Sequence, residues 1–258
     1  MLSDTELLRY SRQLLLEDFD ISGQEKLKNS RILVAGLGGL GSIVSMYLTG
    51  AGIGSLVLAD GDKLDVTNLH RQILYKETDV SKNKALAAKA NLLALNSGVE
   101  ILAIDKYLKS ENLSEILDDI DLVVDATDNY PARFDLNLAC LSRSIPIISA
   151  EAARFEGQIA IIDPSSGGPC YQCLYSETGQ TSALSCSESG VLPPLLGVLG
   201  SLQAFEVIRY LSGFERIPAE SLLFVDLLNL DFRRVRHPAR SDCSTCSYLR
   251  GERIQSSI

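Results

Sequence analysis

Short apolar runs alternate with longer amphipathic segments along the first 150 residues of the chain. Runs rich in Val, Ile, Leu and Ala, typical of buried strands, lie at residues 31–35, 55–59, 99–104, 122–126 and 145–149. Segments with helical periodicity lie between them, at residues 40–48, 82–95, 112–117 and 132–141. Strands that alternate with helices in this way predict βαβ units, and therefore a Rossmann-like α/β fold with a doubly wound, mostly parallel sheet.

The beginning and the end of the chain depart from this alternation. Ser3 and Glu6 form a capping-box pattern in front of an apolar-periodic segment, so we expect an N-terminal helical arm over residues 1–30. Strand-like runs, a turn-rich loop and one long helical segment follow residue 150, at residues 158–163, 222–226, 164–190 and 194–211. The loss of alternation favours antiparallel strands at the C-terminal end. Because no repeat or linker divides the chain, we expect a single domain over residues 1–258.

The composition narrows the class of protein. Of the 258 residues, 46% are hydrophobic and 22% are charged, which is typical of a globular protein. The net charge is −9 and no basic run is present, so nucleic acid is not expected as a partner. The acidic N-terminus does not resemble a secretory signal, which favours a cytoplasmic protein. Residues 32–59 carry no charge, but their seven glycines divide them into strand, turn, helix and strand, so we expect no membrane segment.

A glycine-rich turn follows the first predicted strand. The sequence from Gly36 to Gly41 is GLGGLG, which fits the pattern G-x-G-x-x-G at the start of a helix, and Asp60 ends the next strand. In this context the glycines let backbone N–H groups approach phosphate oxygens, and the helix N-terminus adds partial positive charge. The Asp60 carboxylate would accept hydrogen bonds from a ribose hydroxyl. The motif therefore predicts nucleotide binding, with glycines used only for close helix–sheet packing as the alternative.

The residues around this turn favour a nucleoside triphosphate over NAD. A hydride-transfer enzyme would place a Tyr-x-x-x-Lys or His–Asp pair near the nicotinamide, and neither His70 nor His237 lies in such a pattern. The chain instead offers several cations together with carboxylates, a combination that suits a triphosphate and Mg²⁺. These side chains are Arg9, Arg12, Arg71, Lys84, Asp62 and Asp128. An NAD-dependent oxidoreductase is the alternative.

Several short motifs occur in a fixed order along the chain. They are RYSRQ at 9–13, GLGGLG at 36–41, DGD at 60–62, NLHRQ at 68–72, Lys84, DATDN at 125–129 and GVLGSLQAFE at 197–206. In these motifs the sequence resembles the MoeB/ThiF/HesA family, the bacterial relatives of ubiquitin-activating enzymes. The resemblance implies an enzyme that uses ATP and Mg²⁺ to adenylate the C-terminal Gly-Gly carboxylate of a ubiquitin-like sulfur carrier protein and releases pyrophosphate. It also implies a nucleotide-binding half at 31–150 and a carrier-binding and zinc half at 151–250.

The same resemblance assigns roles to individual residues. Arg12 is expected to reach into the ATP site of the partner subunit of a homodimer, and Asp128 is expected to hold Mg²⁺. The implied catalytic residues are Arg12, Arg71, Lys84, Asp128 and Cys186. The implied nucleotide-binding residues are Gly39, Gly41, Asp60, Asp62, Asn68, Arg71, Gln72, Lys84, Asp128 and Asn129. His70 stands where the family usually has Gln. We interpret this as a solvent-facing substitution, with a changed affinity for ATP as the alternative.

Six cysteines in a chain expected in the reducing cytosol indicate metal binding or chemistry before disulfides. Four of them form two Cys-x-x-Cys pairs, at Cys170, Cys173, Cys243 and Cys246. Two such pairs offer four thiolates to one tetrahedral Zn²⁺ and leave no open coordination position, so we expect a structural zinc site, with a redox role as the alternative. Cys140 falls in an apolar helical pattern and is expected in the core. For Cys186, in the turn-rich loop, the family resemblance implies sulfur or acyl transfer, which adenylation itself does not need, and an inert thiol is the alternative.

The sequence leaves alternatives for the partner and the activity. Residues 3–10 and 154–158 are closer to the MoeB type, which serves the small subunit of molybdopterin synthase, than to the ThiF type, which serves thiazole synthesis for thiamine. Because no rhodanese module fits after Cys246, a separate protein is expected to donate the sulfur. A protein that holds a carrier without activating it is the non-catalytic alternative, and the retained Arg71 and Asp128 argue against it.

Overall fold

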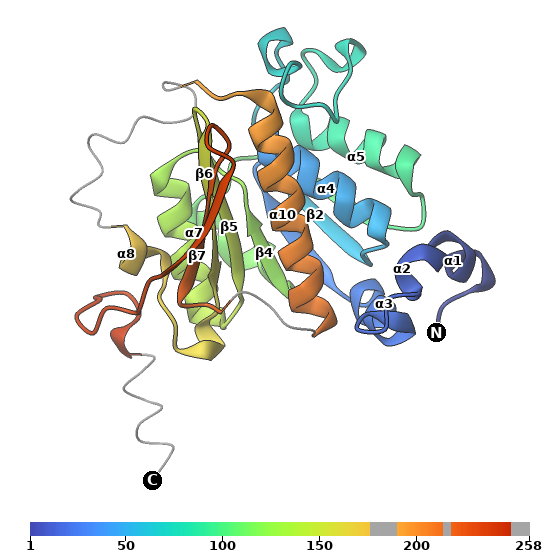
Figure 1. Cartoon of the computed structure of the whole chain (residues 1–258). Coiled ribbons are helices and arrows are strands. Elements are labelled where there is room, and N and C mark those ends of the chain that lie inside the picture. The colour runs from blue at the N-terminus through green and yellow to red at the C-terminus, as the bar shows by residue number, and fades with distance from the viewer. Residues whose placement is uncertain (176–189, 214–217, 249–258) are drawn as a thin grey trace.

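The computed structural model describes residues 1–175, 190–213 and 218–248. In these residues eight strands form one sheet, in the order β3-β2-β1-β4-β5-β6-β7-β8 (Figure 1). The pairs among β1 to β5 are parallel, and the pairs from β5 to β8 are antiparallel. The strands are β1 Arg31–Ala35, β2 Ser55–Ala59, β3 Glu100–Ile104, β4 Leu122–Asp125, β5 Ile147–Ala153, β6 Glu156–Ile162, β7 Ser221–Asp226 and β8 Asp231–Arg236. The predicted α/β fold with antiparallel strands at its C-terminal end is confirmed.

Helices cover both faces of this sheet (Figure 1). They are α1 Asp4–Arg9, α2 Ser11–Leu14, α3 Asp20–Lys28, α4 Gly39–Ala51, α5 Lys84–Leu95, α6 Ser110–Ile116, α7 Tyr130–Arg143, α8 Tyr171–Leu174 and α10 Pro193–Ser212. Leu48, Leu92 and Leu199 from α4, α5 and α10 belong to the hydrophobic core on one face. Leu113 and Leu136 from α6 and α7 belong to the core on the other. Among these helices, none combines the length and the apolar character that crossing a bilayer requires.

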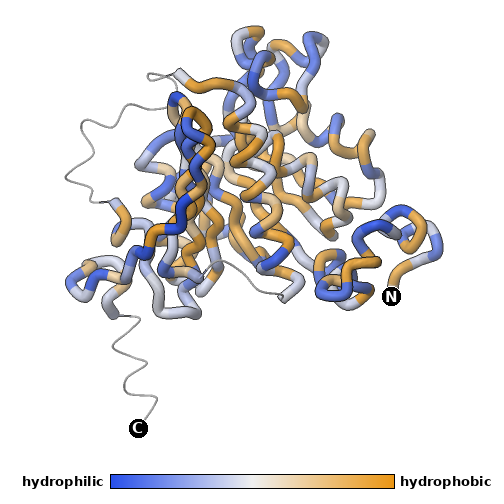
Figure 2. Tube along the Cα trace, viewed as in Figure 1, coloured by the Kyte–Doolittle hydropathy of each residue, from blue (hydrophilic) through white to orange (hydrophobic). Residues whose placement is uncertain are grey.

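Alternate residues of the central strand β1 point into the two cores. Ile32 and Val34 belong to the core under α4 and α10, whereas Leu33 and Ala35 belong to the core under α7. Since successive side chains of a strand point to opposite faces, a strand covered on both faces is apolar at every position. This explains the uninterrupted apolar runs of the sequence, which form the hydrophobic centre of the sheet in Figure 2.

The structure departs from the predicted elements near both ends of the chain. The expected N-terminal helix is divided into α1 and α2 at Tyr10, whose ring packs so closely on Gly52 that a Cβ there would lie 2.4 Å from it. The Tyr10 hydroxyl accepts a 2.9 Å hydrogen bond from Asn96, which further fixes the break. The sequence pattern does not predict the edge strand β8, whose side chains are mostly exposed and charged. Charges on an edge strand prevent pairing with other chains, and they also remove the apolar alternation that signals a strand.

Candidate functional site

A cleft opens where the order of the parallel strands reverses. Strand β1 lies between β2 and β4, and in sheets of this kind ligands bind at the carboxyl ends of the strands next to such a reversal. A cleft of about 640 Å³ occupies this position and is lined by the loops that follow β1, β2 and β4. Of the expected nucleotide-binding residues, those that line it are Gly39, Asp60, Asp62, Asn68, Arg71, Gln72, Lys84, Asp128 and Asn129. The structure therefore brings together residues that are scattered over the first half of the sequence.

The glycine turn after β1 contacts its neighbours closely. Gly36 has a φ of 85°, and a Cβ there would lie 2.8 Å from the backbone oxygen of Ala126. A Cβ at Gly41 would lie 1.9 Å from the Gly36 carbonyl oxygen, and Gly41 does not line the cleft. Gly39 does line it, and no side chain caps the N-terminus of α4. Both interpretations of the motif thus apply at different glycines: Gly41 serves close packing, whereas the uncapped helix start leaves N–H groups available to an anion.

Asp60 stabilises the glycine turn from the neighbouring strand. Its Oδ2 atom accepts a hydrogen bond from the Leu37 N–H at 2.8 Å, and its Oδ1 atom accepts one from the Asp62 N–H at 2.8 Å. Burial raises the pKa of Asp60 even though the Lys84 cation lies nearby. Each carboxylate oxygen can accept a further hydrogen bond, so anchoring the turn and binding a ribose are compatible for this residue.

Lys84 is a buried cation in the wall of the cleft. It is the first residue of α5, and its Nζ atom donates to Asp62 Oδ2 at 2.8 Å. The Tyr107 hydroxyl donates to Asp62 Oδ1 at 2.5 Å. Although burial acts in the opposite direction, the hydrogen bonds from Lys84 and Tyr107 lower the pKa of Asp62. Asp62 therefore holds the ammonium group in place, and two of its three N–H donors remain for a ligand phosphate.

Gln72 presents an unsatisfied acceptor beside the same cleft. Gln72 lines the cleft and is 3% exposed, and its Oε1 atom has no hydrogen-bond partner among the described residues. Leaving a buried acceptor unpaired costs about 1–3 kcal/mol. The adjacent Arg71 donates to the Thr67 carbonyl oxygen at 2.9 Å and contacts the exposed His70 ring at 3.0 Å. Arg71 and the amide group of Gln72 thus give this wall of the cleft a polar character.

Asp128 and Asn129 follow β4 at the opposite wall. Asn129 caps α7, because its Oδ1 atom accepts a hydrogen bond from the Ala132 N–H at 3.0 Å. Asp128 lines the cleft and makes no hydrogen bond with any residue in the described part of the chain. Mg²⁺ in nucleotide sites is commonly bound through one or two carboxylates together with phosphate oxygens and water. The Asp128 carboxylate fits such an ion.

One expected catalytic residue of this chain lies away from its own cleft. Arg12 is exposed on α2 and is not among the residues that line the cleft. Cys186 lies outside the described residues, so its expected role stays a prediction.

The two Cys-x-x-Cys pairs meet in the core on the α7 face of the sheet. All four Sγ atoms lie within 4.8 Å of one another, with 3.7 Å between Cys170 and Cys243 and 3.5 Å between Cys173 and Cys246. Tetrahedral zinc with Zn–S bonds of about 2.3 Å places its sulfur atoms about 3.8 Å apart, so the spacing fits this metal. Burial raises the pKa of the Cys170 thiol, and a cation would offset that effect. Cys140 lies fully buried in the core, as expected, where burial raises its pKa to about 12.

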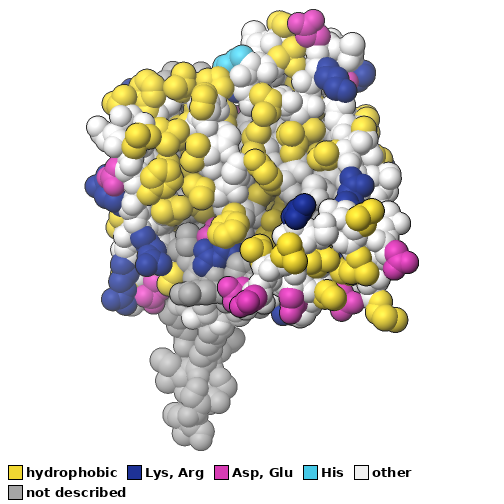
Figure 3. All heavy atoms as spheres, turned by 45° about the vertical axis from the view of Figure 1, so that its right-hand side comes forward, with side chains coloured by type: hydrophobic (Ala, Val, Ile, Leu, Met, Phe, Trp, Pro, Cys, Tyr) yellow, Lys and Arg dark blue, Asp and Glu magenta, His cyan; other side chains and the backbone are white. Residues whose placement is uncertain are grey.

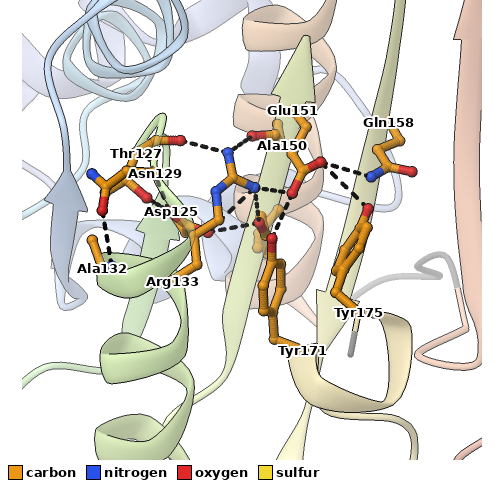
Figure 4. A network of polar contacts seen from close by, with 12 residues as sticks. Asp125, Thr127, Asn129, Ala132, Arg133, Ala150, Glu151, Gln158, Tyr171 and Tyr175 are labelled. Atoms are coloured by element: carbon orange, nitrogen blue, oxygen red, sulfur yellow. Dashed lines mark hydrogen bonds and ion pairs between the residues drawn. The ribbon is translucent and has the colours of Figure 1, made fainter. Parts of the chain in front are cut away.

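A buried polar network that the sequence motifs do not predict connects the cleft with the cysteine cluster. Figure 4 shows Arg133 between the Thr127 carbonyl group and the Glu151 carboxylate. Tyr171 and Tyr175 approach the same carboxylate from the other side. A single arginine in a helix leaves no spacing pattern in the sequence, and only the packing of α7 against β5 reveals its partners.

A sequence profile described as the ThiF family matches residues 10–245 of this chain. The chain belongs to the ThiF family. It is 40% identical over 245 residues to the molybdopterin-synthase adenylyltransferase of Escherichia coli K12. This match covers 95% of the chain and 98% of that protein. The chain is also 39% identical over 245 residues to the sulfur carrier protein ThiS adenylyltransferase of the same organism. That match covers 95% of the chain and 97% of the relative. The family resemblance found in the motifs is confirmed.

Two solved structures share the fold of this chain. The crystal structure of Escherichia coli MccB with MccA-N7isoASN superposes with a TM-score of 0.82 at 25% sequence identity, and the match covers 92% of this chain and 74% of that chain. The crystal structure of PaaA superposes with a TM-score of 0.78 at 26% sequence identity, and the match covers 91% of this chain and 74% of that chain. About a quarter of each solved chain lies outside the match.

Proposed function

We propose that this chain is an ATP-dependent adenylyltransferase that activates the C-terminal Gly-Gly carboxylate of a ubiquitin-like sulfur carrier protein and releases pyrophosphate. The observation that carries the proposal is the cleft at the strand reversal, which is lined by a glycine turn, buried Lys84 and an Asp128 carboxylate without a hydrogen bond to the described residues. The names of the two enzyme relatives supply the reaction and the class of carrier. The small subunit of molybdopterin synthase is the favoured carrier, and the thiamine thiazole carrier is the alternative.

The reaction brings two anions together, and the cleft supplies positive charge. A terminal glycine carboxylate is ionised at neutral pH, so no general base is needed. One carboxylate oxygen attacks the α-phosphorus of ATP, the bond from that phosphorus to the bridging oxygen breaks, and pyrophosphate leaves. Lys84, Arg71 and the N–H groups that begin α4 would neutralise and align the phosphates. Bound Mg²⁺, held by Asp128, would neutralise further phosphate charge.

We propose a structural Zn²⁺ at the cysteine cluster. Four sulfur ligands leave no position for a substrate, so the metal would connect the loop at Cys170 and Cys173 with the segment at Cys243 and Cys246. A Cys₄ zinc site of this kind is compatible with the expected cytoplasmic location. No reaction step requires this metal.

A homodimer would complete the proposed site. An apolar groove between α4 and α10 includes Met46, Tyr47, Leu202 and Phe232, and Figure 3 shows hydrophobic side chains gathered on this face. Tyr47 is 57% exposed and Phe232 is 51% exposed, and exposed apolar patches of this kind usually mark an interface. A second copy that covers the groove would bury it, and Arg12 would act in the cleft of that copy. Sulfur would come from a separate donor protein.

Carrier-dependent ATP–pyrophosphate exchange tests the proposal. The wild-type chain with a molybdopterin-type or thiamine-type carrier should exchange pyrophosphate, and mass spectrometry should detect the carrier with one added AMP. Asp128→Asn should lower the exchange rate about 10²–10³-fold, by analogy with the loss of one transition-state contact. Asp105→Asn, a change of the same kind at an exposed acid outside the cleft, is the matched control. Absence of exchange with every Gly-Gly carrier would contradict the proposal, whereas tight NAD binding without Mg²⁺ would support an oxidoreductase.

A further inference from the structure

Arg133 is a buried cation that lines the cleft and shares the Glu151 carboxylate with Tyr171, in the loop of Cys170 and Cys173. It lies in the first turn of α7, and its side chain is 6% exposed. One guanidinium nitrogen contacts the Glu151 carboxylate and lies 3.9 Å from Asp125, and the other donates to the carbonyl oxygens of Thr127 and Ala150 (Figure 4). A charge so deeply buried is stable only when acids and acceptors surround it. Displacing any one partner therefore changes how the guanidinium is shared among the others.

One end of this network fixes the backbone in front of Asp128. The Thr127 N–H and hydroxyl groups both donate to Asp125 Oδ1, at 3.1 Å and 2.7 Å. The Thr127 carbonyl oxygen accepts from Arg133. Hydrogen bonds thus hold Thr127 through both its N–H and its carbonyl group. Since the Asp128 side chain makes no hydrogen bond of its own with the described residues, its direction depends on this backbone.

The other end of the network reaches the cysteine cluster. Tyr171 lies between Cys170 and Cys173, is 2% exposed, and donates from its hydroxyl to Glu151 Oε1 at 2.7 Å. The Tyr171 N–H donates to Asn137 Oδ1 at 2.9 Å, and Asn137 lies on α7 one turn after Arg133. The loop that carries two of the four cysteines is therefore attached both to the helix of Arg133 and to the acid that pairs with it.

We propose that Tyr171 and Glu151 are positioning residues for adenylation, which transmit the order of the cysteine cluster through Arg133 to the loop that carries Asp128. The proposal rests on the proposed function, because that function assigns Mg²⁺ to Asp128. When the Tyr171 hydroxyl is absent, Glu151 loses a contact that aligns it with the guanidinium. The direction of the loop before Asp128 is then less restricted, and Mg²⁺ with ATP binds more weakly.

Removing single hydroxyl groups tests this route while the fold is kept. In Tyr171→Phe the ring still packs edge-to-face on Phe134, at a centroid distance of 5.3 Å. Tyr175→Phe is the matched control, because the Tyr175 hydroxyl approaches the same carboxylate at 3.4 Å, too far for a strong bond. Tyr171→Phe should raise the Mg²⁺ concentration for half-maximal pyrophosphate exchange about three- to tenfold. The exchange rate at saturating Mg²⁺ should change less. Tyr175→Phe should stay within about twofold of wild type.

Hydrogen exchange supplies a readout that does not depend on activity. In the metal-loaded protein without substrate, backbone amides of residues 125–133 should exchange faster in Tyr171→Phe and in Glu151→Gln than in wild type, while the zinc content per chain stays equal. Removing the metal with a chelator should accelerate exchange of the same amides in wild type. In Tyr171→Phe it should increase their exchange rate little, since the hydrogen bond from Tyr171 to Glu151 is already absent.

Opposite results separate the two proposals. If amide exchange at residues 125–133 and the Mg²⁺ dependence of pyrophosphate exchange are the same in both variants as in wild type, the positioning proposal is overturned. This holds even if the enzyme is fully active. If Tyr171→Phe acts only by losing zinc and Glu151→Gln has no effect, it is overturned as well. If wild type exchanges no pyrophosphate with any carrier, the proposed function fails, and the amide exchange alone still decides whether the cysteine cluster orders this loop.

Discussion

Replacement of Gly41 by Ala tests how closely the first turn of α4 must approach the loop after β1. The new Cβ would lie 1.9 Å from the Gly36 carbonyl oxygen and 2.9 Å from its carbon. Cβ atoms do not approach other heavy atoms closer than 3.0 Å, so the two segments would have to separate by about 1 Å in a closely packed interior. Because the contact is with backbone on both sides, no rotamer change relieves it.

The cost follows from two opposing effects. Overpacking a well-packed site typically costs about 1–3 kcal/mol, and movement of backbone raises this amount. The better helix propensity of Ala returns about 0.5–1 kcal/mol. We therefore expect Gly41→Ala to lower the free energy of unfolding by about 2 kcal/mol, which lowers Tm by about 4–8 °C for a chain of this size. ATP affinity should fall too, since the start of α4 moves.

Gly50→Ala is the matched control on the same helix. Gly50 is exposed, and a Cβ there would meet no atom within 4 Å, so this variant should gain up to about 1 kcal/mol from helix propensity alone. Urea denaturation followed by circular dichroism gives the stability of each variant, and calorimetry gives its ATP affinity. A Gly41→Ala protein as stable as wild type, or a Gly50→Ala protein equally destabilised, would refute the steric argument.

Three further predictions concern the partner subunit, the loop cysteine and the N-terminal arm. If the proposed homodimer forms, an equal mixture of inactive Arg12→Ala and Asp128→Ala chains should restore about one quarter of wild-type adenylation. Half of the dimers would then be mixed, and each mixed dimer would hold one intact site out of two. Cys186→Ala should exchange pyrophosphate at nearly the wild-type rate, since the carrier carboxylate itself attacks ATP. The hydrogen bond from Lys28 lowers the pKa of Glu6 to about 2. The contact therefore stabilises the arm above pH 4.5, and this stabilisation is lost as the pH falls through 2. Amide exchange of the arm, compared between pH 5 and pH 2, should detect the loss.

Each of these predictions has a result that contradicts it. Absence of recovery in the mixture would mean that Arg12 does not act across subunits. Loss of pyrophosphate exchange in Cys186→Ala would place this cysteine in adenylation itself. An equal acid response in Glu6→Gln would assign the loosening of the arm to other groups.

Local patterns in the sequence predicted the part of the fold that both core clusters enclose. The apolar runs at 31–35 and 55–59 coincide with β1 and β2, and the long helix at 194–211 lies within one residue of α10 at both ends. Strands covered on both faces and helices with clear ends leave strong signals because burial constrains every position. The exposed edge strand β8 and the break at Tyr10 left none, because neighbouring elements decide them.

The sequence alone determined which chemical groups the protein has and the order of strands and helices that carries them: a glycine turn between a strand and a helix, cations and acids in family order, and two pairs of cysteines. The tertiary structure decided which of these groups meet. Cys170 and Cys243 are 73 residues apart, and Arg133 and Glu151 are 18 apart, yet each pair is in contact. The physical reason is that sequence patterns record local backbone preference and burial, whereas contacts between distant segments depend on how helices and strands pack around the shared sheet.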